Sequence, residues 1–186
     1  VGTPPSDAIV LFDGKNASAW RKGNGDPITW NIKDGYMEVS EGGGSIFTQK
    51  GFGDCQLHIE WYAPVLDGPT GQNYANSGVY LMNTYEIQVL NSHVNQTYAD
   101  GQAAAIYGQH APMVNASRAP GNWQVYDIIF YRPRFDEEGA LISPATVTAF
   151  HNGVLVHNNV SPTGATEWQE RPPYKYHESR LPISLQ

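Results

Sequence analysis

Polar and apolar side chains alternate along short stretches of almost the whole chain, and Gly, Pro, Asn or Asp residues separate these stretches. The side chains of a β-strand point alternately to its two faces, so this pattern predicts strands with one buried face. The stretches are rich in the β-branched and aromatic residues that strands favour. No window of a dozen residues has the apolar spacing of a helix. The pattern predicts nine strands, at residues 29–33, 36–40, 45–49, 54–63, 77–82, 85–91, 123–131, 146–151 and 154–160.

Two of the predicted connections are tight hairpin turns. Asp34-Gly35 and Asn152-Gly153 each stand between two predicted strands. A two-residue type I′ turn needs positive φ at both positions, which Asn, Asp and Gly adopt most readily. Many short strands with almost no helix predict an all-β fold, either a sandwich or a barrel. The chain has 186 residues and no internal repeat or low-complexity linker, so we expect a single domain over residues 1–186.

The composition narrows the class of ligand. The formal net charge is −7, and no run of more than two Lys or Arg residues occurs. Nucleic acids and anionic membrane surfaces attract clustered positive charge, so we expect neither as a partner. No stretch approaches the ~18 consecutive apolar residues of a membrane span, so no membrane insertion is expected. A neutral ligand such as a carbohydrate is compatible with this charge.

Three predicted strands carry hydrogen-bonding side chains on the face opposite their apolar residues. One interpretation is an ordinary sheet with a solvated outer face. The other is a binding face, because sugars need planar hydrogen-bonding groups for their hydroxyls and aromatic rings for their C–H surfaces. We expect the polar faces to line one shared cleft. They hold His58, Glu60 and Tyr62 on residues 54–63, Tyr80 on residues 77–82, and Glu86 and Gln88 on residues 85–91.

Three long irregular stretches interrupt the strands, at residues 64–75, 92–120 and 161–180. Loops of this length in a compact domain are more often functional than idle. The second stretch contains Tyr107 and His110, and all three stretches contain aromatic residues. We expect these loops to form the rims of a binding groove.

Several side chains are candidates for the chemistry. Glu60 and Glu86 are the only acidic residues within the well-patterned central strands of the polar face. Two carboxylates that flank a glycosidic bond can act as acid and as base or nucleophile. His58 and His110 are alternative general bases, because imidazole titrates near neutrality, and a structural role stays open for both. The spacings typical of zinc, EF-hand calcium, nucleotide-phosphate and serine-hydrolase sites are absent, so no metal-binding residue is predicted.

Short motifs in a fixed order resemble the 3-keto-disaccharide hydrolase domain family. Each motif alone is weak, whereas their order and spacing over nearly the whole chain are specific. The motifs are Leu11-Phe12-Asp13-Gly14-Lys15-Asn16 followed by Trp20, Trp30 with Asp34-Gly35, Gly51-Phe52-Gly53-Asp54, Leu57-His58-Ile59-Glu60-Trp61, Asn76-Ser77-Gly78-Val79-Tyr80, Tyr85-Glu86-Ile87-Gln88-Val89-Leu90, Ala105-Ile106-Tyr107-Gly108 with Pro112, Gly121-Asn122-Trp123, Asn152-Gly153 and Ile183-Ser184-Leu185-Gln186.

The resemblance implies a fold and a reaction. The family is similar to concanavalin A-like lectins and glucanases, which implies a two-sheet antiparallel jelly-roll sandwich. It also implies hydrolysis of glycosides or disaccharides whose C3 hydroxyl has been oxidised to a ketone. Family members are common among exported bacterial proteins, so a periplasmic or extracellular location is expected, with the signal absent from this chain. No cofactor is firmly implied, and a divalent metal ion is left open.

Site roles follow from the resemblance residue by residue. Glu86 is the expected base or metal-facing carboxylate, assisted by Glu60 or His58. The substrate-binding residues that the resemblance implies are Asn76, Tyr80, Gln88, Tyr107 and Trp123, and His110 of the second long loop is added to them as a candidate.

The chain departs from the family pattern in two places. Asn91 stands where the family usually has Asp, and the family continues past Gln186 with an Asp-His-Gly segment and one more strand, so the C-terminal end is expected to be truncated. The alternative function is a non-catalytic carbohydrate-binding module of the same fold. A conventional glucanase fits less well, because the pattern Glu-x-Asp-x-x-Glu is absent around Glu86.

Overall fold

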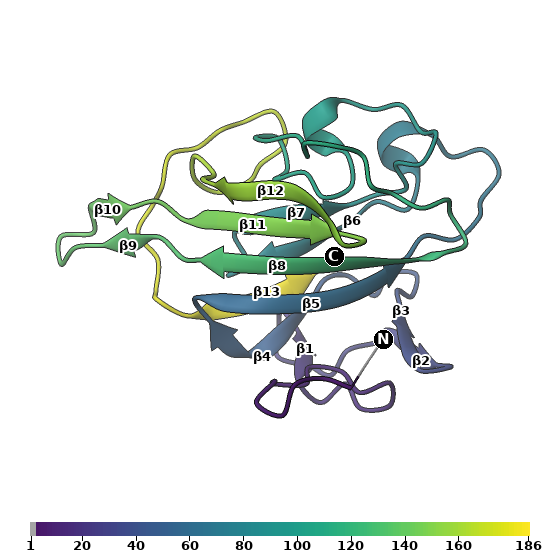
Figure 1. Ribbon diagram of the computed structural model, residues 1–186. Helices are drawn as coiled ribbons and strands as arrows, with labels where there is room; N and C mark the ends of the chain where they lie inside the picture. The colour runs from purple at the N-terminus through teal and green to yellow at the C-terminus, as the bar shows by residue number, and fades with distance from the viewer. Residues whose placement is uncertain (1–2) are drawn as a thin grey trace.

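The computed structural model describes residues 3–186, and these form two antiparallel β-sheets packed face to face (Figure 1). In Figure 1 the four-stranded sheet lies in front of the five-stranded sheet. The four-stranded sheet has the order β12 (Val154–Val160), β11 (Thr146–His151), β8 (Trp123–Tyr131) and β5 (Cys55–Tyr62). The five-stranded sheet has the order β1 (Trp20–Lys22), β4 (Ile46–Phe52), β13 (Leu181–Leu185), β6 (Ser77–Leu81) and β7 (Tyr85–Val89).

Smaller elements surround the two sheets. One two-stranded sheet pairs β2 (Asn31–Lys33) with β3 (Tyr36–Glu38), and another pairs β9 (Arg134–Phe135) with β10 (Leu141–Ser143). The second extends beyond one end of the sandwich (Figure 1). Two single 3₁₀ turns lie in the loops, η1 (Gly71–Asn73) and η2 (Ala99–Gly101). Within residues 3–186, no helix has the length and apolar character required to cross a membrane.

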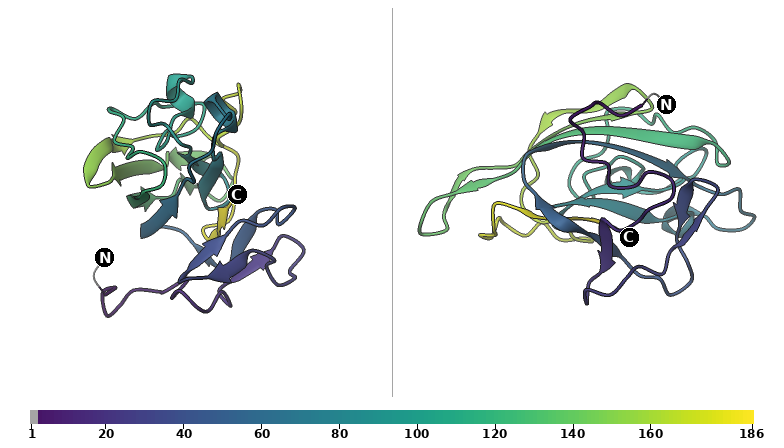
Figure 2. Two further views of the ribbon diagram at one scale, coloured as in Figure 1. Left: turned by 90° about the vertical axis from the view of Figure 1, so that its right-hand side faces the viewer. Right: turned by 90° about the horizontal axis from the view of Figure 1, so that it is seen from below.

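The core lies between the sheets and is built by alternate residues of each strand. In β8, Tyr126 and Phe130 are buried, whereas Asp127 and Tyr131 on the other face are exposed. From the opposite sheet, Tyr85 packs its ring 5.6 Å from that of Phe130, measured between centroids. Figure 2 shows the two sheets as separate layers. Each sheet therefore gives apolar side chains to the interior between the layers and directs the alternate side chains outward.

Both predicted hairpin turns are confirmed. Asp34 and Gly35 join β2 to β3 with φ values of 50° and 84°, and Asn152 and Gly153 join β11 to β12 with φ values of 52° and 80°. Positive φ at both central positions is the requirement of the type I′ turn. These turns set the strand register in the two hairpins.

All nine predicted strands are present, with ends that differ by a few residues, and the all-β two-sheet sandwich is confirmed. The predictions omit β1, β9, β10 and β13. Strand β13 is the important omission, because it lies inside the five-stranded sheet between β4 and β6. It contains Pro182, which has no N–H for a sheet ladder. The structure accommodates this residue where the register between β13 and β4 shifts, which is where a sheet tolerates proline.

The alternation in β8 predicts opposite results for two adjacent aromatic residues. Phe130 is 1% exposed and Tyr131 is 56% exposed. We expect Phe130→Ala to lower the free energy of unfolding by about 3–5 kcal/mol, because it leaves a cavity in the core. We expect Tyr131→Ala to cost less than about 1 kcal/mol. Urea unfolding monitored by circular dichroism measures both values, and equal losses would contradict the inward and outward assignment.

Candidate active site

Strands β6 and β7 bring Tyr80 and Glu86 side by side. The two residues pair directly across the antiparallel ladder. Both point away from the core, because the next pair along the ladder, Val79 and Ile87, is buried in it. Beyond β7, a loop continues the row: the backbone N–H of Tyr107 donates to the Glu86 carbonyl oxygen at 3.2 Å. We call this outer surface of the five-stranded sheet the Glu86 face; it carries Tyr80, Glu86, Gln88 and Tyr107.

The carboxyl group of Glu86 is shielded from solvent. Its side chain is almost completely buried, at 4% exposure. Burial disfavours the charged form and raises the pKa of Glu86 to about 7, while a hydrogen bond from Tyr80 acts in the opposite direction. The backbone is fixed as well, since the Glu86 N–H donates to Thr166 Oγ1 at 2.9 Å. A carboxyl group that titrates near neutrality can accept and return a proton at physiological pH.

A glycine makes room for this carboxyl group. Gly78 lies on β6, opposite Gln88 and two residues before Tyr80. A Cβ atom at Gly78 would lie inside the contact distance of the Glu86 carboxyl group and 2.9 Å from the Tyr80 ring. The sequence Gly78-Val79-Tyr80 therefore supplies both the space above the sheet and the phenol beside the acid.

The phenols of Tyr80 and Tyr107 both lie close enough to Glu86 for its charge to raise their pKa. The hydroxyl oxygens of Tyr98 and Tyr107 are 2.6 Å apart and share a hydrogen bond. Burial, and then the hydrogen bond with Tyr98, raise the pKa of Tyr107, and burial followed by the charge of Glu86 raises that of Tyr80. Both phenols therefore stay neutral and keep a proton to donate. The ring of Tyr98 packs directly over Gly101, where a Cβ atom would collide with it.

A chain of side-chain amides fixes the orientation of Gln88. Gln72 Nε2 donates to the Gly101 carbonyl at 2.8 Å, so Gln72 Oε1 faces Gln88 and accepts from Gln88 Nε2 at 3.0 Å. Asn76 Nδ2 donates to the Gln72 carbonyl at 2.9 Å. Gln88 Oε1 is left buried and has no hydrogen-bond partner among residues 3–186. The Glu86 face therefore contains one acceptor whose direction the protein sets but which no described residue satisfies.

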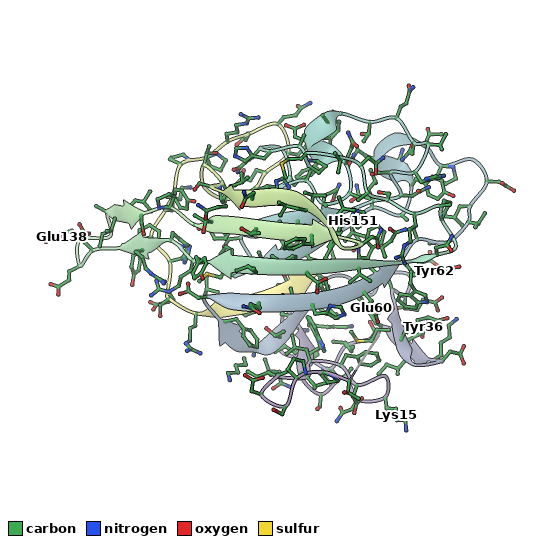
Figure 3. The ribbon with its side chains drawn as sticks, in the orientation of Figure 1. Lys15, Tyr36, Glu60, Tyr62, Glu138 and His151 are labelled. Carbon is green, nitrogen blue, oxygen red and sulfur yellow. The ribbon has the colours of Figure 1, made fainter. Side chains whose placement is uncertain are left out.

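The predicted cleft shared by Glu60 and Glu86 is wrong. Glu60 lies on β5 in the four-stranded sheet and points away from the core, as its buried neighbour Trp61 shows (Figure 3). Glu86 lies on the outer face of the other sheet. The two outer faces are on opposite sides of the core, because packed sheets are about 10 Å apart and both side chains point outward. His58 shares the outer face of β5 with Glu60, and its Nδ1 is 2.6 Å from Asp127 Oδ1.

Two predicted substrate-binding residues also lie apart from Glu86. Trp123 opens β8 on the outer face of the four-stranded sheet and packs 5.6 Å from the Tyr62 ring. The ring of His110 makes a hydrogen bond to the Ser161 carbonyl at 3.1 Å, which ties the loop of residues 92–120 to the end of β12. Of the nine predicted site residues, the structure brings together Tyr80, Glu86, Gln88 and Tyr107, with Asn76 joined to them through Gln72.

Several residues of this face are not among the site residues that the sequence predicts. Thr166 and Tyr98 come from the long loops, whose fold the strand pattern does not predict. Gln72 lies in η1, within the stretch at residues 64–75. Gly78 is the one residue of this set that has a local sequence signal, because a glycine inside an alternating strand often marks a close approach by another group.

The side chains around Glu86 do not resemble a conventional metal site. In the part of the chain that the structure describes, no three His, Cys, Asp or Glu side chains converge in a way that could hold a metal ion. Glu86 is surrounded by phenol and amide groups instead.

Similar proteins place the chain in a family. Three crystal structures of proposed glycosyl hydrolases from Parabacteroides distasonis share the fold. One is 45% identical, covers 99% of this chain and 78% of its own, and has a TM-score of 0.95. The second is 17% identical, covers 96% of this chain and 86% of its own, and has a TM-score of 0.68. The third is 20% identical, covers 94% of this chain and 88% of its own, and has a TM-score of 0.64. At these identities, the second and third structures show the fold alone.

No curated protein matches the chain. The structural neighbours support a glycosidase-type enzyme that acts on a carbohydrate. The family model of the 3-keto-alpha-glucoside-1,2-lyase-like domain matches residues 7–186. As its ordered motifs predict, the chain belongs to the 3-keto-alpha-glucoside-1,2-lyase-like domain family.

Proposed function

We propose that this protein cleaves 3-keto-glycosides on the Glu86 face, by elimination followed by addition of water. The observation that carries the proposal is a buried carboxyl group with a pKa of about 7 beside neutral phenol donors. Family membership supports the same reaction class. In the proposed reaction the ketone at C3 of the sugar acidifies the proton on C2, so that a carboxylate of ordinary strength can remove it.

Glu86 is the proposed base. Its carboxylate takes the C2 proton, and the electron pair of the C2–H bond moves toward the C3 carbonyl oxygen and forms an enolate. The enolate then expels the C1 substituent, so that the C1–O bond breaks and a C1–C2 double bond forms. Water adds back across this double bond, with its oxygen on C1 and a proton on C2. The net reaction consumes one water and releases the 3-keto sugar and the free alcohol, and Glu86 ends unchanged.

The phenols are the proposed proton donors. Tyr80 pairs with Glu86 across the ladder, and the Tyr107 phenol, from the loop side, lies within the influence of the Glu86 charge. A neutral donor aimed at the C3 oxygen stabilises the enolate as its charge develops, and a second donor can protonate the departing alcohol. The Tyr98 hydroxyl, at 2.6 Å from that of Tyr107, orients it and can pass a proton to it.

The geometry disfavours the conventional two-carboxylate mechanism for the predicted pair. Retaining and inverting glycosidases place their two carboxyl groups about 5–9.5 Å apart on either side of the glycosidic bond. Glu60 and Glu86 lie on opposite outer faces of the sandwich, with the core between them. One sugar cannot contact both. An elimination that needs a single base fits the Glu86 face better.

Replacement of the proposed base should abolish the reaction. We expect Glu86→Gln to lower the release of monosaccharide from a 3-keto-disaccharide by a factor of roughly 10²–10⁴ or more. The matched control is Glu60→Gln, which makes the same chemical change on the opposite face and should keep full activity. Chromatography of the products measures both, beside the unoxidised disaccharide, which should not be cleaved. A fully active Glu86→Gln variant would reject the role of Glu86. Binding without release from either sugar would favour a carbohydrate-binding module.

The reaction should depend on pH through Glu86. The base acts in its charged form, so kcat/KM should rise with pH and level off above about 7, the pKa of the free enzyme's Glu86. The hydrogen bond from Tyr80 lowers that pKa, so Tyr80→Phe should move the rising limb to higher pH. A pH profile of kcat/KM for both proteins tests this, and a limb that stays in place in Tyr80→Phe would show that another group titrates.

The buried acid should also cost stability at high pH. The folded-state pKa of Glu86 is about 7, against 4.5 for the unfolded chain, so the folded protein binds the extra proton between these values. Stability therefore falls as pH rises from 4.5 through 7, by up to about 3 kcal/mol. Glu86→Gln lacks this titration and should be more stable than the wild type at pH 8, with a smaller difference at pH 4.5. Thermal unfolding at the two pH values checks this, and the same gap at both would contradict it.

A further inference from the structure

A group of arginines meets at the end of the sandwich where β8 passes into β9, the side from which the β9–β10 hairpin projects (Figure 1). A cavity of about 280 Å³ opens there. We call it the arginine cavity. It is lined by Phe52, Gly53, Asp54, Arg132, Arg134, Ser179 and Arg180, and by none of the residues of the Glu86 face.

Glycines allow the walls of this cavity to come together. Gly53 lies in the turn between β4 and β5, and a Cβ atom there would be 2.6 Å from the Ser179 carbonyl oxygen and 3.1 Å from Arg132 Cδ. A Cβ atom at Gly51 would likewise be 3.0 Å from the backbone of Arg180. The close packing of these segments holds three guanidinium-bearing residues around one space.

The lining of the cavity contains more arginines than carboxylates. Three arginines line it with a single carboxylate, Asp54. Both oxygens of that carboxylate are engaged: Oδ1 accepts the backbone N–H of Arg132 at 2.9 Å, and Oδ2 accepts Arg134 Nη2 at 2.5 Å. The nearest further acidic residues, Asp136, Glu137 and Glu178, line an adjoining cavity that shares Arg132, so the positive surplus is confined to the arginine cavity itself.

One guanidinium donor beside the cavity is unsatisfied. Arg134 Nη1 is buried and has no hydrogen-bond partner within residues 3–186, although the neighbouring Nη2 is paired. A buried N–H of a charged group without an acceptor costs free energy, and a hydrogen-bond acceptor at this position would remove that cost. An ion pair between Asp54 and Arg134 would be complete without further cations. The presence of Arg132 and Arg180 around the same cavity is therefore not explained by that pair.

We propose that the arginine cavity binds the oxyanion group of a small ligand, a sulfate, phosphate or carboxylate. Guanidinium groups bind such anions through paired N–H donors, and the planar fork of arginine fits their oxygen spacing. The volume leaves room for more than the anion itself. The site is separate from the Glu86 face, so it adds to the proposed catalytic function and does not depend on it.

Thermal unfolding and calorimetry of the whole chain test this site. Sodium sulfate, sodium phosphate and sodium glucuronate are compared with sodium chloride at equal ionic strength, because nonspecific screening is then the same. A bound anion raises the melting temperature in a saturable way. Saturation by sulfate and phosphate would assign an ester group, and saturation by glucuronate would assign a carboxylate. No saturable effect from any of the three would overturn the proposal.

Two charge-matched variants locate the binding. Arg180 is exposed at the cavity, so Arg180→Gln should fold normally and raise the anion's dissociation constant about tenfold, roughly the loss of one charge-assisted hydrogen bond. Arg21 is exposed on β1 and does not line the cavity, so Arg21→Gln changes the net charge equally and should bind as the wild type does. Equal affinities of the two variants would overturn the site, because any binding would then reflect net charge alone.

Discussion

The structure depends on the burial of alternate side chains between two β-sheets. Each strand can give only one face to the core, and the opposite face must point outward. The contact between Tyr85 and Phe130 is one of many that join the sheets across this layer. Once Tyr85 and Ile87 are committed to the interior, Glu86 and Gln88 have to occupy the outer face of the same strand. The core therefore positions the candidate site from the opposite face of the same strands.

Burial of the Glu86 carboxyl group lowers the stability of the folded protein. A carboxyl group at 4% exposure loses its hydration, and the surrounding residues compensate only in part. Thr166 satisfies the backbone N–H, Gly78 leaves the space and Tyr80 offers a hydrogen bond. An acid on a solvated strand face would avoid this cost, as Glu60 does on the other sheet. Energetically unfavourable burial of a titratable group is typical of functional sites, where a shifted pKa serves the chemistry.

The sequence predicts the elements of this fold better than their partners. Alternation and turn residues identify nine strands and the face that each one buries, because both signals are local. They do not tell which of two sheets a strand joins. Two outward faces have the same pattern whether they are neighbours or lie on opposite sides of the core, which is why Glu60 and Glu86 were expected together. Strand β13 was missed for a related reason, since Pro182 obscures its pattern and only its partners β4 and β6 define it. The loop residues Tyr98 and Thr166 reach the site through long-range contacts that no local signal encodes.

The charge states of the site favour an uncharged ligand whose proton is removed during the reaction. Burial raises the pKa of Glu86 toward neutrality and keeps the phenols of Tyr80 and Tyr107 protonated. Near pH 7 the face therefore presents one exchangeable proton on a carboxyl group and neutral hydrogen-bond donors, with no lysine or arginine in the row that β6 and β7 form. Such a set stabilises negative charge only when it develops on the substrate. An already anionic ligand would meet repulsion from ionised Glu86, whereas the arginine cavity at the end of the sandwich offers the opposite field. The fold thus separates two polar regions of different charge, and the neutral donors around a single base are what make the acidified C–H bond of the proposed 3-keto substrate a suitable target.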